Sequence, residues 1–151
     1  MRLAMKTLNV GRTVSAPLES VWKVVSDVGD YAAYAPNIDT SRVLSGEGVG
    51  LVRECGSKEG RWKELCTFWR EQKCYEFEIQ TQADDYPFPF KMLRGKWSVD
   101  AVNENETTIH MRFDLQFKNK VVGWFLYPIM KFQFMKVCET LLDNWQASVE
   151  R

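Results

Sequence analysis

The chain has little of what metal centres and nucleophilic catalysis require. Its only histidine is His110, and its four cysteines, at positions 55, 66, 74 and 138, show no CxxC spacing. Because zinc sites need clustered Cys and His ligands, we expect no metal site. His110 falls on the polar side of an alternating segment, which indicates a surface histidine without the orienting partner that a catalytic base needs. Unpaired cysteines are typical of a reducing compartment and favour a cytoplasmic location.

An excess of charge of one sign and long apolar runs are also missing. Lys plus Arg and Asp plus Glu both number 20, so the formal net charge is zero and nothing favours a nucleic-acid partner. No stretch reaches the ~18 to 20 apolar residues of a membrane-spanning helix, and residues 1–13 lack the apolar core of a secretory signal. The glycine-rich run 46–50 precedes no expected helix, so the dinucleotide-binding pattern fails and we expect no cofactor.

Aromatic residues, in contrast, are abundant. The chain of 151 residues contains six Trp, five Tyr and nine Phe. This length fits one domain over residues 1–151, which is large enough to bury a core without disulfides or metals. Large planar rings are typical either of a thick core or of a ligand-lined cavity. Composition alone favours the first interpretation.

The amino-terminal part predicts a strand followed by two short helices. Alternating apolar residues indicate a strand over residues 5–15. Pro17 fits the first position of a helix, where its fixed φ is suitable and its missing N–H is not needed. Gly29 is expected to end this helix, and a second short helical piece is expected over residues 30–34, stopped by Pro36.

From about residue 38 the hydrophobic period becomes two, which predicts strands. They are expected at residues 39–45, 51–55, 61–69, 74–81, 91–102 and 107–117. Short connections imply antiparallel neighbours, and alternation implies that one face of the sheet is covered. Residues 120–150 then carry apolar positions at helical spacing, and Pro128 is expected to kink this helix or to start its main part.

Together these elements predict an α+β fold. The single apolar face of a sheet of about seven strands needs a cover, and the only long helix that the sequence offers is the C-terminal one. Strand twist makes such a sheet curl naturally. We therefore expect a curved antiparallel sheet wrapped around the long C-terminal helix, with the two short helices after the first strand.

Several motifs are similar to those of a known superfamily. Residues 10–36, VGRTVSAPLESVWKVVSDVGDYAAYAP, resemble the opening of the START-like (SRPBCC) superfamily, in which a first strand leads into an APxxxVW segment. The run GVGLVR at residues 48–53 resembles its GxGxxR strand, and KEL at residues 63–65 resembles the acidic position of the next strand. The other matching positions are Ala16, Pro17, Val21, Trp22, Asp27, Tyr34, Pro36, Pro87, Gly95, Trp97 and Thr107.

This resemblance covers nearly the whole chain and is closest to the polyketide cyclase/dehydrase and lipid-transport branch. It implies the helix-grip fold, in agreement with the pattern of elements. Members of the superfamily include lipid carriers, hormone receptors, aromatase/cyclases and ubiquinone-binding proteins. The resemblance therefore implies a fold and does not specify one function.

Two charged residues fall on the side of their strands that the pattern predicts to be covered. Arg53 is in phase with Leu51 and Cys55, and Glu64 is in phase with Trp62. A buried charge is costly unless it is paired. We expect these residues either to orient a polar group of a ligand or to form a structural pair at the rim of the barrel. A strand in the opposite phase would instead place them in solvent.

The other candidate ligand contacts are apolar side chains expected to lie between the sheet and the long helix. They are Trp62, Phe68, Tyr75, Phe77, Phe88, Phe90, Trp97, Met111, Phe113, Met130 and Phe134. Phe88 and Phe90 belong to segment 84–90, which two prolines stiffen. We interpret this segment either as a lid beside a pocket mouth or as a turn whose rings plug the end of the core.

The start of the C-terminal helix is more apolar than one helix face requires. Its apolar residues are Val121, Val122, Trp124, Phe125, Leu126, Tyr127, Ile129 and Met130. One interpretation is burial under the short helices. The others are contact with a membrane surface, although not as an integral membrane protein, contact with a partner protein, or a place at the cavity entrance.

These features lead to three hypotheses for function. The first is binding or transport of a small hydrophobic ligand, such as a lipid, an isoprenoid or quinone, or a polyketide, by a monomer or weak dimer. The second is a cyclase or dehydratase in which Glu64 acts as general acid or base and Tyr75 or Tyr86 donates a hydrogen bond. The third is an adaptor that uses the surface at residues 124–130. The lack of a catalytic constellation favours binding.

Overall fold

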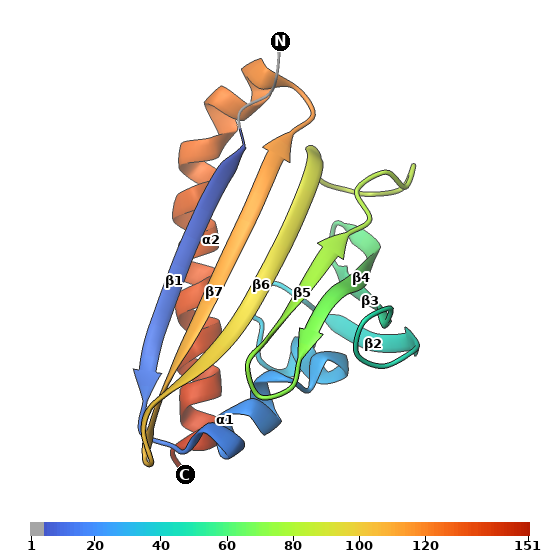
Figure 1. Cartoon of the computed structure of the whole chain (residues 1–151). Helices are drawn as coiled ribbons and strands as arrows, with labels where there is room; N and C mark the ends of the chain where they lie inside the picture. Colours follow the sequence, from blue (N-terminus) through green and yellow to red (C-terminus); the bar gives the residue numbers. More distant parts are fainter. Residues whose placement is uncertain (1–4) are drawn as a thin grey trace.

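The computed structural model describes residues 5–151 and consists of one antiparallel sheet with helices packed against one of its faces (Figure 1). Residues 1–4 of the predicted domain lie outside the described residues. In chain order the elements are β1 (Lys6–Val14), α1 (Leu18–Val25), the 3-10 helix η1 (Val28–Ala33), β2 (Thr40–Ser45), β3 (Val52–Ser57), β4 (Gly60–Arg70), β5 (Cys74–Ile79), β6 (Phe90–Asn103), β7 (Glu106–Phe117) and α2 (Lys120–Val149).

The strand order places the first strand beside the last. Across the sheet the order is β1-β7-β6-β5-β4-β3-β2. Helix α2 packs along β1 and β7, and α1 packs against α2. Figure 1 shows α2 behind β1 and β7, while β5, β4, β3 and β2 curve away from it. This arrangement confirms the predicted helix-grip fold with its long C-terminal helix and two short helices.

Alternation along β7 fixes the face that meets the helices. Ile109, Met111, Phe113 and Leu115 are buried, and their polar neighbours in the sequence point to the other face. The inward side chains of β5 follow the same pattern. The period-two pattern therefore predicted the covered face of these two strands correctly.

Strand β4 departs from simple alternation. Cys66 pairs with Phe77, but Phe68 pairs with Glu76 and Trp69 pairs with Tyr75, so one extra residue is accommodated between Cys66 and Phe68. A bulge of this kind reverses the faces of all following side chains. The prediction that Phe68 faces the interior is therefore wrong: its side chain is 43% exposed, and Trp69 takes the inward place.

Helix α1 is shorter than predicted. Pro17 precedes the helix in an extended conformation, with φ −68° and ψ 155°, and the helix ends at Val25 rather than at Gly29. The backbone turns at residues 26–27, and Val28 is buried at the start of η1. Gly29 lies inside η1 and does not end α1, because burial of Val28 requires the chain to turn earlier.

Helix α2 begins at Lys120 and runs through Pro128, so the proline does not start its main part. The Asn119 side chain accepts hydrogen bonds from the backbone N–H groups of Val121 and Val122, which caps the first turn. A Cβ atom on Gly123 would lie 2.8 Å from the Phe117 ring, so glycine lets this turn approach β7 closely. No helix within residues 5–151 is long and apolar enough to cross a membrane.

Candidate functional site

Aromatic rings in mutual contact fill the deep part of the interior. Trp97 of β6 stacks on Tyr75 at a centroid distance of 5.4 Å. Its ring also meets Phe77 at 6.2 Å, Phe113 at 5.5 Å and Tyr31 of η1 at 5.9 Å. Edge-to-face and offset contacts of this kind stabilise aromatic clusters beyond the burial of their surface. This cluster is a packed core in the present conformation.

Glycine at position 95 makes room for the Trp97 ring. A Cβ atom there would lie 2.6 Å from the ring of Trp97 and 3.1 Å from the ring of Phe113. Such distances are far below ordinary van der Waals contact, and both rings are held by their neighbours. The sequence Gly95-Lys96-Trp97 therefore lets the indole fold back over its own strand.

Arg53 and Glu64 form a buried ion pair beside this cluster. The Nε and one terminal nitrogen of Arg53 donate to Oε1 of Glu64 at 3.0 and 2.7 Å, and the other terminal nitrogen donates to the Val28 carbonyl at 3.0 Å. The guanidinium lies 4.2 Å from the Phe77 ring centroid and 4.6 Å from that of Tyr31. Strand β3 at Arg53, and strand β4 at Glu64 before its bulge, therefore have the phase that the sequence predicts.

The pair is balanced electrostatically. Burial is the largest single influence and would lower the pKa of Arg53. The charge of Glu64, together with smaller contributions from Cys55, Tyr75 and Tyr31, outweighs burial and raises that pKa, so the guanidinium stays charged. The second Glu64 oxygen, Oε2, accepts a hydrogen bond from Trp62 Nε1 at 2.8 Å. Both carboxylate oxygens thus have protein partners, as expected for a structural pair. A direct contact with a ligand stays a prediction.

Segment 84–90 turns its aromatic rings towards the protein. Tyr86 and Phe88 pack on Trp62 at centroid distances of 6.5 and 5.4 Å. Phe90 packs on Phe117 at 5.1 Å. These contacts are those expected of a turn whose rings plug the end of the core, and the role of the segment as a lid stays a prediction.

Apart from Phe68, which is exposed, burial separates the predicted ligand contacts into two groups. Arg53, Glu64, Tyr75, Phe77, Phe90, Trp97, Met111 and Phe113 are buried. Trp62, Phe88, Met130 and Phe134 are only half-buried, and Leu93 belongs with them. The second group comes from β4, the β5–β6 loop, β6 and the first half of α2. Each side chain of the second group therefore keeps part of its apolar surface uncovered by protein.

The reactive groups of the interior are held in their protonated forms. All four cysteines are free and buried, and burial raises the pKa of the Cys138 thiol to about 12 and that of Cys66 above its usual value. Burial also raises the pKa of Tyr75, whose hydroxyl donates to the Val25 carbonyl at 2.6 Å. These groups suit a core better than a nucleophilic site.

Within residues 5–151, two buried indole N–H groups have no hydrogen-bond partner. They are Nε1 of Trp97 and Nε1 of Trp145, whose residues are 2% and 1% exposed. Both rings contact Tyr31, at centroid distances of 5.9 and 6.2 Å. An unpaired buried donor costs about 1–3 kcal/mol, so each of these positions favours an acceptor in the interior.

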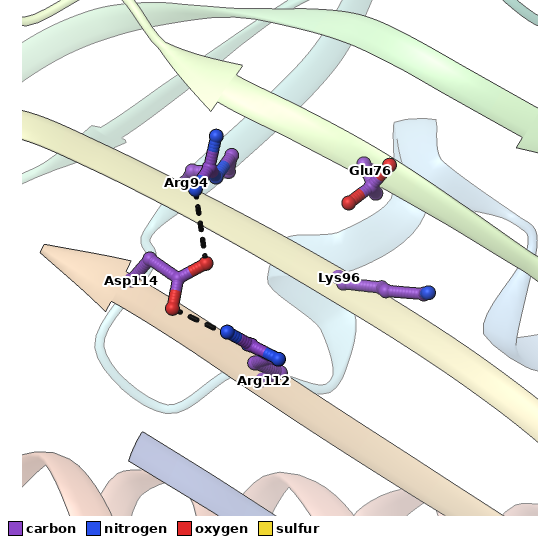
Figure 2. A pocket seen from close by; sticks show the side chains of 5 residues that line it. All are labelled: Glu76, Arg94, Lys96, Arg112 and Asp114. Carbon is purple, nitrogen blue, oxygen red and sulfur yellow. Dashed lines mark hydrogen bonds and ion pairs between the residues drawn. The ribbon is translucent and has the colours of Figure 1, made fainter. Parts of the chain in front are cut away.

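A second feature, a charged hollow of about 290 Å³, lies on the opposite face of the sheet. It is lined by Glu76, Arg94, Lys96, Arg112 and Asp114 from β5, β6 and β7 (Figure 2). Asp114 accepts from Arg94 at 3.2 Å, from Arg112 at 3.3 Å and from Thr7 at 2.7 Å.

This network stabilises the carboxylate of Asp114. Burial opposes its ionisation, but the hydrogen bonds from Thr7, Arg112 and Arg94 together outweigh burial and lower its pKa. The two arginines form cross-strand ion pairs on a partly exposed surface, and each such pair contributes little on its own. The hollow is a stabilising charge cluster on the outer face.

Sequence reasoning missed two aromatic residues of the interior, Tyr31 and Trp69, and it did not reveal the unpaired N–H of a third, Trp145. Tyr31 contacts Arg53, Trp97 and Trp145, yet it lies in a 3-10 helix that offers no periodic pattern. Trp69 lies inward because of the bulge in β4, which leaves no signal in the sequence. Trp145 follows the helical spacing, but nothing in that spacing shows that its N–H is unpaired.

The fold and the aromatic interior define a helix-grip domain, in which a curved antiparallel sheet packs around a long C-terminal helix. The family model for polyketide cyclase/dehydrase and lipid transport matches residues 5–150, so the chain belongs to this family.

Relatives of known sequence and structure agree with this assignment. The chain is 28% identical to the ribosome association toxin RatA of Vibrio cholerae over 119 residues, which is 78% of this chain and 80% of that protein. Its fold is similar to that of the Zhui aromatase/cyclase of a Streptomyces species, with a TM-score of 0.79 and 16% identity over 98% of this chain and 95% of that one.

Two further structures share the fold. A START superfamily protein from Mycobacterium smegmatis has a TM-score of 0.75 and 19% identity, covering 95% of this chain and 97% of that one. Norcoclaurine synthase from Thalictrum flavum has a TM-score of 0.75 and 12% identity, covering 99% of this chain and 96% of that one. At these identities the likeness concerns the fold alone.

Proposed function

We propose that the protein binds a small hydrophobic ligand, such as a lipid, an isoprenoid or a polyketide-like molecule, between the open end of the sheet and the first half of α2. The observation that carries this proposal is the half-buried layer of Trp62, Phe88, Leu93, Met130 and Phe134. Each of these apolar side chains keeps part of its surface uncovered, and burial of such surface against an apolar molecule contributes about 25 cal/mol per Å² before ordering costs.

The deep aromatic cluster forms the floor of the proposed site. Trp97 and Tyr75 are fully enclosed by other rings, so they support the ligand from below. The unpaired N–H groups of Trp97 and Trp145 favour a ligand with a hydrogen-bond acceptor, such as a carbonyl or hydroxyl oxygen, if its polar end reaches the layer around Tyr31. Arg53 and Glu64 hold this floor in place.

The alternative functions have weaker support. A cyclase that uses Glu64 as acid or base requires a free carboxylate, but Arg53 and Trp62 occupy both oxygens. Association with a ribosome, which the name of the Vibrio cholerae relative states for that protein, would favour a basic surface, whereas the formal net charge here is zero. The buried free thiols support a cytoplasmic location, and the monomer or weak dimer stays an expectation.

A matched pair of helix variants tests this proposal. Met130→Trp adds volume on the inward side of α2, whereas Phe132→Trp changes a side chain that is 64% exposed on the outward side. We expect Met130→Trp to weaken binding of a fatty acid, an isoprenoid quinone or a polycyclic aromatic by about tenfold or more, and Phe132→Trp to leave it unchanged.

The readouts are thermal shift and native mass spectrometry with these three classes of ligand. A saturable complex in the unmodified protein and in Phe132→Trp, and its loss in Met130→Trp at unchanged far-UV circular dichroism, would support the proposal. No complex with any of the classes, or equal binding by both variants, would contradict it.

A further inference from the structure

The first half of α2 exposes a continuous apolar stripe to solvent. Val121, Phe125, Ile129 and Phe132 follow one another at intervals of three and four residues, so they share one side of the helix. Their exposed fractions are 64%, 64%, 61% and 64%. We call these four residues the outer stripe. Gly123 and Phe134 of the same turns face the sheet, so the outer stripe points away from the core.

The same side of the helix changes character in its second half. Continuing at the same spacing, the next residues are Lys136, Glu139, Asp143 and Gln146, and Glu150 follows directly after the helix. Glu139 and Asp143 form ion pairs with Arg12 of β1, and Glu150 accepts a hydrogen bond from the Ser15 backbone. A solvent-facing helix side is normally polar along its whole length, and the second half meets this expectation. The apolar residues of the first half therefore require a separate explanation.

The charges around the outer stripe have one sign. Between Asp114 and Glu139 the chain contains Lys118, Lys120, Lys131 and Lys136 and no acidic residue, although the whole chain has a formal net charge of zero. The Lys136 ammonium lies 4.4 Å from the centroid of the Phe132 ring, at the end of the stripe. Trp124, one turn from Val121 and 74% exposed, lies at the beginning of the helix.

We propose that the outer stripe docks on an anionic lipid bilayer, with α2 lying in the plane of the interface. An interfacial helix combines an apolar side, which enters the boundary between headgroups and acyl chains, with lysines that meet lipid phosphates. Lysine side chains are long enough to place their ammonium groups at the headgroups while their methylenes stay beside apolar neighbours. An exposed Trp such as Trp124 is suited to the same boundary.

A bilayer fits these features better than a second copy of this protein or a nucleic acid does. In a two-fold contact between two copies the same lysines would face each other across the interface, which is repulsive. A nucleic acid could pair with the lysines, but its phosphate backbone gives Val121 and Ile129 no apolar medium. Anionic lipids offer both negative charge and acyl chains.

The fold constrains the orientation of the docked protein. The start of α2 lies at the end of the molecule opposite to α1, beside the start of β1 (Figure 1). The β5–β6 loop at this same end carries Asp84 and Asp85, which an anionic surface repels. The contact therefore involves the side of the helix and keeps this loop and the outer charged face of the sheet in water.

Vesicle flotation tests this proposal directly. The full chain is mixed with vesicles of phosphatidylcholine alone or of phosphatidylcholine with phosphatidylglycerol, and Trp124 fluorescence is followed in parallel. We expect the protein to bind the anionic vesicles, with a blue shift of the tryptophan fluorescence that Trp124→Phe removes. The triple variant Phe125→Ser, Ile129→Ser and Phe132→Ser should bind these vesicles at least about tenfold more weakly than the unmodified protein. Lys131→Glu with Lys136→Glu should abolish the preference for phosphatidylglycerol.

The control replaces Val49 and Val102 by serine, since these valines are 63% and 59% exposed and lie outside α2. Binding by this control at the level of the unmodified protein supports the proposal. Three results would overturn it: no flotation with anionic vesicles, undiminished flotation of the triple serine variant, or self-association that the triple variant relieves. Ligand binding in vesicle-free solution is measured separately, so docking and the proposed function fail independently.

Discussion

The Arg53–Glu64 pair makes a quantitative prediction about stability. Arg53 is 1% exposed and donates two hydrogen bonds to Glu64 and one to Val28. Arg53→Met leaves the Glu64 carboxylate buried with Trp62 Nε1 as its remaining donor. Removing one partner of a buried pair costs about 3–5 kcal/mol, which is a large part of the roughly 5–15 kcal/mol that stabilises a typical domain. For a domain of this size the melting temperature should fall by roughly 6–20 °C.

The double variant Arg53→Met with Glu64→Leu separates a lost charge partner from lost packing. Both charges are then absent, and the groups left without their partners are the Val28 carbonyl and the Trp62 N–H. Each costs about 1 kcal/mol or somewhat more, so the double variant should be more stable than either single variant. Urea denaturation of the four proteins in this cycle gives the coupling free energy.

An exposed ion pair on the neighbouring strand serves as the control. Arg42 is 68% exposed and lies 3.4 Å from Glu54, so Arg42→Met should change the free energy of unfolding by less than about 1 kcal/mol. The reasoning about the buried pair is refuted if Arg53→Met costs no more than Arg42→Met. It is also refuted if the double variant is as unstable as the two single variants added together.

Three further predictions concern packing and pH. Gly123→Ala places a Cβ atom 2.8 Å from Phe117, so α2 must shift and the melting temperature should fall by several degrees; an unchanged value would contradict the close approach. Because the bulge turns Phe68 outward and Trp69 inward, Phe68→Ser should be nearly neutral in urea denaturation and Trp69→Ser should cost more than about 2 kcal/mol; equal effects would disprove the bulge. The lowered pKa of Asp114 stabilises the fold above the unfolded-state value of about 3.9, and this contribution is lost as pH falls through the lower folded value. In Asp114→Asn the free energy of unfolding should therefore fall less steeply in acid than in the unmodified protein. An equally steep fall in both proteins would contradict this assignment.

The sequence was most informative where one period extends over many residues. Five alternate apolar positions of β7 predicted the covered face of the central sheet, and all five are buried. The apolar spacing over residues 120–150 predicted α2 to within one residue at its C-terminal end. Short connections predicted antiparallel pairing because a hairpin leaves no length for a crossover.

Features that depend on one residue or on tertiary contacts were not predictable in the same way. The bulge in β4 inserts a single residue and reverses Phe68 and Trp69 without any change in composition. Tyr31 reaches Arg53 from a turn of 3-10 helix, which has no hydrophobic period to read. The outer hollow depends on the register that sets Arg94 opposite Asp114, which alternation alone does not fix.

The side-chain environment of the proposed ligand site was predictable only in part. Alternation placed Arg53 and Glu64 on the covered side, and the structure pairs them there. Whether the aromatic rings leave room or fill the interior depends on their rotamers, and the packing of Trp97 on Tyr75 shows that the deep end is filled. The space proposed for a ligand therefore moves towards Met130 and Phe134.

Methionine methyl groups report on this space most directly. Met130 and the buried Met111 lie on the inner side of the fold, whereas Met5 is 49% exposed and Met92 pairs across the strands with Gln116 on the outer side. In NMR spectra of protein labelled at the methionine methyls, a fatty acid, an isoprenoid quinone or a polycyclic aromatic should shift the Met130 signal saturably, with a smaller shift for Met111. Unchanged spectra with all three ligands, or shifts confined to Met5 and Met92, would contradict ligand binding between the sheet and α2.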